Sequence, residues 1–138
     1  MADVVESLSR VPLFRGIRGR ELGRLARVMS ESQFSEGETV TAEGQSGVGF
    51  FVIEEGNATV SRQGNIIRTL EPGDYFGEIA LIDEGPRSAT VVATTDLRCR
   101  GMVAWEFRSF VRDHPEVAWT LLGTLVSRLR EAEGAEAV

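Results

Sequence analysis

Between Ser32 and Val103 the sequence consists of short runs rich in Val, Ile, Phe and Thr, separated by Gly, Asn, Asp and Pro. Runs of this kind predict β-strands joined by tight turns, and their close succession predicts a sandwich or a barrel. Glycines recur between the runs, where a positive φ angle costs glycine little. The expected strands are 32–35, 39–41, 50–53, 58–62, 66–70, 89–93 and 97–103.

Helical patterns flank this β region on both sides. Leu22, Leu25, Ala26 and Met29 recur at helical spacing and predict a helix over 19–29. Further helices are expected over 105–111 and 115–132, because turn signals become rare there and Pro115 suits a first helical turn. One apolar stripe is expected on the last helix, made of Ala118, Leu121, Leu122, Leu125, Leu129 and Ala132.

The length of 138 residues predicts a single domain. Within it we expect a helical lead (1–30), a β region (31–103), C-terminal helices (104–132) and a frayed tail (133–138). The formal net charge of −6 argues against non-specific attraction to nucleic acid or anionic lipid. The sequence contains neither a signal peptide nor an apolar run of membrane-spanning length, so a cytoplasmic protein is expected.

The residues that usually carry catalysis or bind metals are scarce. Cys99 is the only cysteine, which excludes an intramolecular disulfide and predicts a buried, strand-borne thiol. His114 is the only histidine and lies at a helix boundary, where a capping role is common. No set of nucleophile, base and orienting group is recognisable. We therefore expect no enzyme activity, no catalytic residue, no metal site and no cofactor.

One segment, Tyr75 to Val91, interrupts the β texture. Gly77 permits close approach of the backbone, and the residues after it are expected to form a short helical turn with outward N–H groups. Arg87 follows Glu78 by nine residues and carries a planar fork of donors suited to phosphate. A carboxylate accepts hydrogen bonds from sugar hydroxyls, so the pair together indicates a ribose phosphate.

Residues 76–91 closely resemble the phosphate-binding cassette of cyclic-nucleotide-binding domains. These cassettes typically read F-G-E-[IL]-[AG]-L, a short spacer and R-[SAT]-A, and this sequence departs at none of those positions. The family includes the β-rolls of catabolite activator proteins and of protein kinase A regulatory subunits. The resemblance implies an α+β fold: an eight-stranded antiparallel β-roll with an N-terminal helical segment, a short cassette helix and two C-terminal helices.

The resemblance also implies roles for individual residues. Glu78 would accept from the ribose 2′-hydroxyl, and Arg87 would bind the exocyclic phosphate oxygens. Ser88 would contact phosphate or the purine edge, although a turn-satisfied hydroxyl is an equal alternative. The implied ligand is cAMP, with cGMP left open. Backbone contacts would come from Gly77, Ile79, Ala80 and Ala89.

In this family the trailing helix commonly closes over the base. That implies a cap from Leu125, Arg128 or Leu129, while packing of the leucines on the roll or on a twin helix is the competing interpretation. A homodimer through this helix is left open. A simpler interpretation of the cassette, in which Glu78 and Arg87 form a salt bridge that closes a loop, also stands.

The leading hypothesis is a cyclic-nucleotide sensor module that signals by changing its contact with a protein partner, without direct binding to nucleic acid or membrane. One alternative is a transcription regulator of the catabolite-activator type; only 133–138 follow the long helix, so it would need a separate DNA-binding part. The other is a structural interaction module that has the fold but binds no nucleotide.

Overall fold

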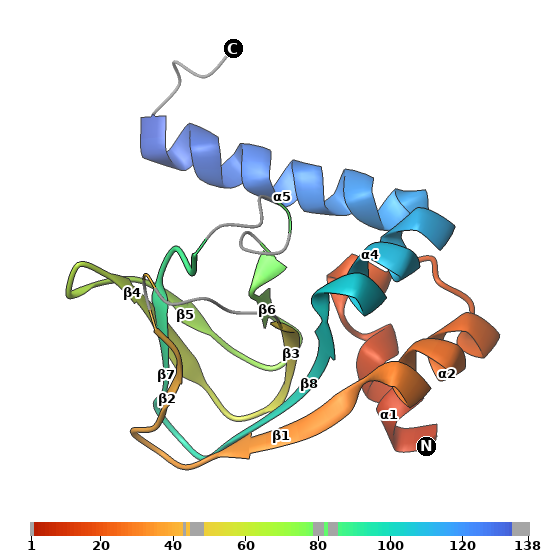
Figure 1. Ribbon diagram of the computed structural model, residues 1–138, viewed down its shortest axis with the longest axis horizontal. Coiled ribbons are helices and arrows are strands. Elements are labelled where there is room, and N and C mark those ends of the chain that lie inside the picture. Colours follow the sequence, from red (N-terminus) through yellow and green to blue (C-terminus); the bar gives the residue numbers. More distant parts are fainter. Residues whose placement is uncertain (1, 43, 45–48, 79–81, 83–85, 134–138) are drawn as a thin grey trace.

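The computed structural model describes residues 2–42, 44, 49–78, 82 and 86–133, and it places two four-stranded antiparallel sheets beside a group of helices (Figure 1). One sheet has the order β1-β8-β3-β6 and the other has the order β2-β7-β4-β5. The strands are β1 (Ser30–Phe34), β2 (Thr39–Thr41), β3 (Gly49–Glu55), β4 (Ala58–Arg62), β5 (Asn65–Leu70), β6 (Tyr75–Phe76), β7 (Thr90–Ala93) and β8 (Leu97–Val103).

Side-chain alternation explains how the strands form a roll. In β7 and β8 buried residues alternate with half-buried ones, as expected for strands that turn one face to a core. The β3–β8 pairing sets Phe50 opposite Met102 and Ile53 opposite Cys99. All four of these side chains are buried, Phe50 and Met102 in the cluster that includes the helices and Ile53 and Cys99 in the cluster within the roll. This strand pair is therefore buried on both faces.

Helices precede and follow the roll. They are α1 (Ala2–Ser9), the 3₁₀ helix η1 (Pro12–Phe14), α2 (Gly19–Val28), α4 (Ala104–Asp113) and α5 (Pro115–Glu133). The Glu106 carboxylate accepts from the Val103 N–H at 3.2 Å and so satisfies a free donor at the start of α4. In Figure 1, α1, α2 and α4 gather at one end of the roll, and α5 extends from there across the cassette side.

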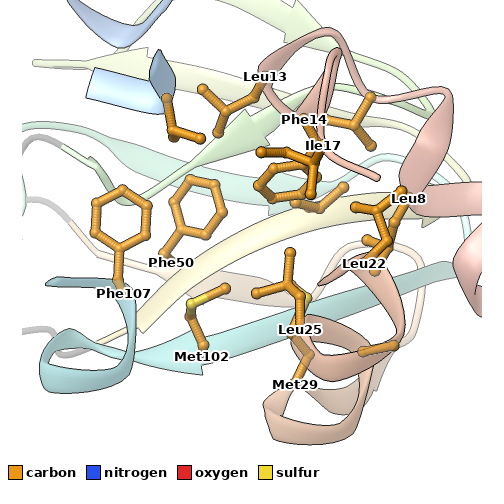
Figure 2. Packing of buried hydrophobic residues seen from close by; sticks show 14 of the residues in the cluster. Leu8, Leu13, Phe14, Ile17, Leu22, Leu25, Met29, Phe50, Met102 and Phe107 are labelled. Atoms are coloured by element: carbon orange, nitrogen blue, oxygen red, sulfur yellow. The ribbon is translucent and has the colours of Figure 1, made fainter. Parts of the chain in front are cut away.

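The buried apolar residues form two clusters. The first joins the helices to the face of β3 and β8 that carries Phe50, Val52 and Met102, and Figure 2 shows side chains of this cluster. In this cluster the Phe50 and Phe107 rings stack with centroids 4.7 Å apart, which ties β3 to α4. The second cluster lies within the roll and includes Ile53, Leu70 and Cys99. The helical end is therefore fixed to the roll by its own core.

The predicted fold class is confirmed. The expected strands and the three expected helices are present with small shifts of their ends. Three described elements were not predicted from the pattern: α1, the 3₁₀ helix η1, and β6, which has only two residues. Cys99 is buried in β8, as expected. Within the described ranges, no helix combines the length and apolar content that a membrane crossing requires.

The expected single apolar stripe on α5 is wrong. Val117 and Leu121 are buried against the rest of the protein, while Leu122 and Leu129 are about half exposed. The helix thus has an inner face and a separate exposed apolar face. A stripe drawn on spacing alone merged them, because the apolar residues of α5 cover most of its circumference.

Candidate functional site

The cassette begins where the short strand β6 ends. Tyr75 and Phe76 pair with Val52 and Phe51 of β3, which fixes the start of the segment to the roll. Gly77 then adopts a φ of +96°, and Glu78 follows it. Arg87 lies just before β7, at the other end of the cassette. Both charged residues are therefore anchored next to regular strands.

Gly77 is required by space as well as by its backbone angle. A Cβ atom at this position would overlap the carbonyl oxygen of Gly49 and approach Arg87 Nη1 to 2.9 Å. The φ of +96° is also unfavourable for any residue with a side chain. The glycine thus allows the cassette backbone and the Arg87 guanidinium to lie against β3.

Arg87 is 7% exposed and is held by backbone carbonyls. Its Nη2 donates to the Gly49 oxygen at 2.9 Å and its Nη1 donates to the Gly77 oxygen at 3.3 Å. Its buried Nε has no acceptor among the described residues. Burial lowers the pKa of Arg87 while the nearby Glu78 opposes that effect, and an arginine stays charged at neutral pH in any case. Arg87 is therefore a fixed cation whose Nε–H group is still available as a hydrogen-bond donor.

Glu78 is held by a side chain instead. Its Oε1 accepts from Arg128 Nη1 of α5 at 2.9 Å, and its side chain is only 4% exposed. Its Oε2 is also buried, and no described residue donates a hydrogen bond to it. The structure describes no ion pair between Glu78 and Arg87, so the interpretation of the two as a loop-closing salt bridge is wrong.

A pocket joins these groups. Its empty space of about 550 Å³ includes open solvent at its mouth. Its walls come from the sheet that contains β4, β5 and β7, from the cassette, and from Arg128 of α5. The lining residues are Thr41, Val60, Arg62, Ile67, Arg68, Leu70, Tyr75, Phe76, Gly77, Glu78, Arg87, Ser88, Ala89, Val91 and Arg128. One wall is thus largely apolar and the cassette wall is charged.

The predicted site residues fall into three groups. Gly77, Glu78, Arg87, Ser88 and Ala89 line the pocket together, although their roles toward a ligand remain predictions. Ile79 and Ala80 lie outside the described residues. The three candidate caps differ in position. Arg128 lines the pocket and contacts Glu78, whereas Leu125 and Leu129 are absent from its lining.

Three ionisable residues of the pocket lining were missed by sequence reasoning. Arg62 and Arg68 come from the β4–β5 hairpin, and the Arg62 Nε donates to the Ser88 carbonyl at 3.0 Å. Burial lowers the pKa of Arg68, and the charge of Arg128 lowers it further. Burial likewise raises the pKa of the Tyr75 phenol. The position of Tyr75 beside the motif was a usable signal, but nothing distinguished these two arginines among fifteen.

His114 lies away from this pocket, at the junction of α4 and α5. Its Nδ1 is 3.5 Å from a Glu21 oxygen and 3.4 Å from a Glu116 oxygen. Within the described parts of the chain, no group of three or more His, Cys, Asp or Glu residues is arranged to hold a metal ion. The charged pocket of the cassette is therefore the candidate site.

Known proteins are similar to this chain over most of its length. A CRP-like cAMP-activated global transcriptional regulator of Mycobacterium tuberculosis is 32% identical over 130 residues, which cover 91% of this chain and 58% of the relative. A cAMP-dependent protein kinase regulatory subunit of Mycosarcoma maydis is 37% identical over 136 residues, which cover 94% of this chain and 25% of that protein. The chain thus spans less than two thirds of these relatives.

A solved structure gives the same result. The catabolite activator protein of Thermus thermophilus superposes with a TM-score of 0.81 at 30% identity, and the match covers 88% of this chain and 60% of that one. The family model described as the cyclic nucleotide-binding domain matches residues 31–114, which contain the roll, the cassette and α4. With the cassette geometry above, these matches establish that the chain belongs to the cyclic nucleotide-binding domain family.

Proposed function

We propose that the pocket binds a cyclic nucleotide, with cAMP as the preferred ligand and cGMP as the alternative. The observation that carries the proposal is a pair of buried, oppositely charged side chains in one pocket, each with a buried polar atom that no described residue engages. A cyclic nucleotide needs both: an anionic diester for Arg87 and a sugar hydroxyl for Glu78. The names of the two curated relatives, both of which mention cAMP, support the choice of adenine.

Different residues of the pocket bind different parts of the ligand. Arg87 neutralises the phosphate through its free Nε and the remaining hydrogens of its guanidinium, because charge-assisted bonds to phosphate are strong. Gly77, Ile79, Ala80, Ser88 and Ala89 add contacts from the cassette. The purine lies against the apolar wall that includes Val60 and Leu70. The preference between adenine and guanine depends on contacts with residues outside the cassette.

Calorimetric titration with cAMP and cGMP tests the proposal. Arg87→Ala removes a charge-assisted contact worth about 1.5 to 3 kcal/mol, so affinity is expected to fall about ten- to hundredfold. Arg10→Ala is the matched control, since Arg10 is exposed on the surface and pairs only with Glu6 among the described residues. Unchanged affinity in Arg87→Ala would refute the phosphate contact.

The proposed role is regulatory, with no reaction at the nucleotide. The nucleotide recovered after long incubation is expected to be intact by chromatography. In this proposal the protein acts in the cytoplasm and changes its contact with a protein partner when the nucleotide binds. If the fold served only as an interaction module, neither nucleotide would raise the melting temperature; a true ligand at a hundred times its Kd adds about 2.7 kcal/mol of stability.

The exposed face of α5 supports a homodimer. Trp119, Leu122, Val126 and Leu129 are 47% to 76% exposed and are spaced three, four and three residues apart, as in a two-helix seam. This face lies opposite Val117 and Leu121, which pack inward. An apolar stripe with heptad spacing packs well against an identical stripe on another helix, so we propose that a second copy of the chain covers this face of α5.

Sedimentation of two variants tests the dimer. Val126→Glu places a charge in the seam and is expected to give monomers, whereas Ser127→Glu places the same charge beside the seam and is expected to leave dimers intact. Both residues are exposed, so neither substitution disturbs the core. A wild-type protein that stays monomeric at high concentration would exclude this role for α5.

The match to the Mycobacterium tuberculosis regulator supports a second candidate function, that of a transcription regulator acting through a separate DNA-binding part. The net charge of −6 argues against direct DNA binding by the domain itself. In a mobility-shift assay with cAMP, the chain alone is therefore expected to leave DNA unshifted. A cAMP-dependent shift by the chain itself would favour the regulator and would contradict the proposed division of roles.

A further inference from the structure

A groove lies between α2 and α4, which Figure 1 shows at the end of the roll where the helices gather. Its empty space of about 920 Å³ includes open solvent, so it is a surface groove and not a closed cavity. It shares no lining residue with the pocket of the cassette. The lining residues are Glu21, Arg24, Leu25, Val28, Trp105, Glu106, Ser109, Phe110, Asp113 and His114.

The apolar part of this groove is exposed to water. Trp105 is 71% exposed and Val28 is 46% exposed, although Leu25 of the same groove belongs to the buried core. Tryptophan is among the residues most often found at the energetic centre of protein interfaces. The other tryptophan, Trp119, lies on the exposed apolar face of α5, so Trp105 is not part of the proposed dimer seam. Its exposure is therefore not explained by the fold or by that seam.

The charged part of the groove is acidic. Its described lining contains Glu21, Glu106 and Asp113 but one arginine, Arg24. Asp113 is the last residue of α4, where the helix dipole places partial negative charge. Among the described residues, none forms an ion pair with the Asp113 carboxylate. A carboxylate at the C-terminal end of a helix is stabilised by a nearby cation, so the groove favours a basic partner.

The spacing of the two parts suits a helix. Trp105 and Asp113 are eight residues apart on α4, which separates them by about 12 Å along the helix axis. A helix lying in the groove spans this distance with residues seven or eight positions apart, and such residues lie on one face of it. An apolar side chain and a basic side chain at that spacing therefore reach the two parts of the groove together.

We propose that this groove docks an amphipathic helix of a protein partner, with an apolar side chain against Trp105 and Val28 and an arginine or lysine beside Asp113. The proposed function requires a protein partner, and to that extent the assignment rests on it. A second copy of the chain fits this groove poorly, because the acidic residues would face a chain with the same net charge of −6.

The groove is also connected to the helix that borders the nucleotide pocket. His114 lines the groove, and its Nδ1 lies 3.4 Å from a carboxylate oxygen of Glu116 in the first turn of α5. Arg128 of the same helix lines the pocket of the cassette. A docked partner therefore lies next to the start of α5, where a shift of this helix would change the contact.

The fluorescence of Trp105 tests this docking with a synthetic probe. The probe is an acetylated, alanine-based helical peptide with two leucines one turn apart and two arginines on the same face two turns later. In Trp119→Phe, Trp105 is the remaining tryptophan, and its emission is expected to shift to the blue because the ring leaves water. A scrambled peptide of the same composition is expected to cause no shift. No shift with the first peptide, or an equal shift with both, would overturn the proposal.

Anisotropy of the labelled peptide measures the two contacts separately. Trp105→Ala is expected to weaken binding about tenfold or more, as for a tryptophan at the centre of an interface. Asp113→Asn is expected to weaken it about threefold, as for an exposed ion pair. Glu36→Gln is the matched charge control, because Glu36 is exposed between β1 and β2, far from the groove in the sequence. Equal losses in Asp113→Asn and Glu36→Gln would mean attraction by net charge alone and would overturn the assignment.

Two further measurements separate the other outcomes. If Trp105→Ala converts a dimer into monomers in sedimentation, a second copy covers the groove and the proposed partner is wrong. Nucleotide titration of the same samples keeps the two proposals apart. Peptide binding by a protein that binds neither cAMP nor cGMP would support the groove and overturn the proposed function, and nucleotide binding without peptide binding would do the reverse.

Discussion

The two buried charges of the pocket are held in different ways. Arg87 is fixed by main-chain carbonyls at Gly49 and Gly77, which belong to the roll and the cassette. Glu78 is fixed by a side chain of α5, a helix that belongs to the C-terminal segment. The proposed phosphate half of the site is therefore part of the roll, whereas the proposed ribose half includes a residue that α5 holds in place.

In the proposed function, this difference would let one pocket serve both nucleotide binding and signalling. A main-chain cradle keeps its geometry as long as the sheets are intact, so the phosphate contact needs no conformational change. A contact with α5 couples sugar recognition to the position of a helix that also carries an exposed apolar face. A ligand shifts such an equilibrium only by its differential affinity for the two states, and in the proposed function Glu78, which bonds to α5, is the residue at which that difference arises.

The largest effect is expected when the main-chain cradle itself is broken. Gly77→Ala adds a Cβ that overlaps the Gly49 carbonyl and crowds Arg87, so nucleotide affinity is expected to fall more than about hundredfold in calorimetry. Backbone strain of about 1–2 kcal/mol is added to this steric effect.

Gly73→Ala is a matched control for that strain. Gly73 has the same φ of +96°, but a Cβ there meets no atom within 4 Å. It is expected to lose about 1 kcal/mol of stability while affinity stays within about twofold. Equal losses of affinity in the two variants would mean that backbone strain accounts for the effect, and not the overlap of the added Cβ with Gly49 and Arg87.

A smaller effect is expected when the two charged residues of the site are compared by amide exchange in α5. Glu78→Gln removes the charge that holds Arg128, so amide exchange in α5 from Thr124 to Glu133 is expected to accelerate about tenfold in the free protein. Arg87→Gln removes a charge of the same pocket and is expected to leave exchange in α5 unchanged, because Arg87 bonds only to carbonyls among the described residues. Mass spectrometry of peptic fragments measures both, and acceleration by Arg87→Gln would show that α5 is coupled to the phosphate half as well.

The same division explains what could be predicted from sequence. The strands, the helices and the cassette residues were predictable, because strand patterns are local and the motif occupies one continuous segment. The partner of Glu78 was not, since Arg128 lies fifty residues away and is one of fifteen arginines. The strand β6 was missed because two residues are too few to show an alternating pattern.

The smallest effect at neutral pH concerns the roll core, because it develops only in alkaline solution. Burial raises the pKa of Cys99 to about 12 from an ordinary value of 9.0, so the folded protein keeps the thiol proton where the unfolded chain loses it. The contribution of the buried thiol to stability is therefore complete below about pH 9 and is lost as pH rises toward 12, at up to about 1.4 kcal/mol per pH unit.

Urea unfolding from pH 8 to 11 measures this loss. Cys99→Ala is expected to flatten the decline above pH 9, while the small cavity it leaves lowers stability by a similar amount at every pH. Tyr75→Phe, at the contact with α5, is expected to act only above about pH 10, because burial raises the pKa of the phenol from that value. A decline that keeps its full slope in Cys99→Ala would mean that another group, such as the buried Tyr75 phenol, causes it, so that the loss would arise beside the cassette and not in the core of the roll.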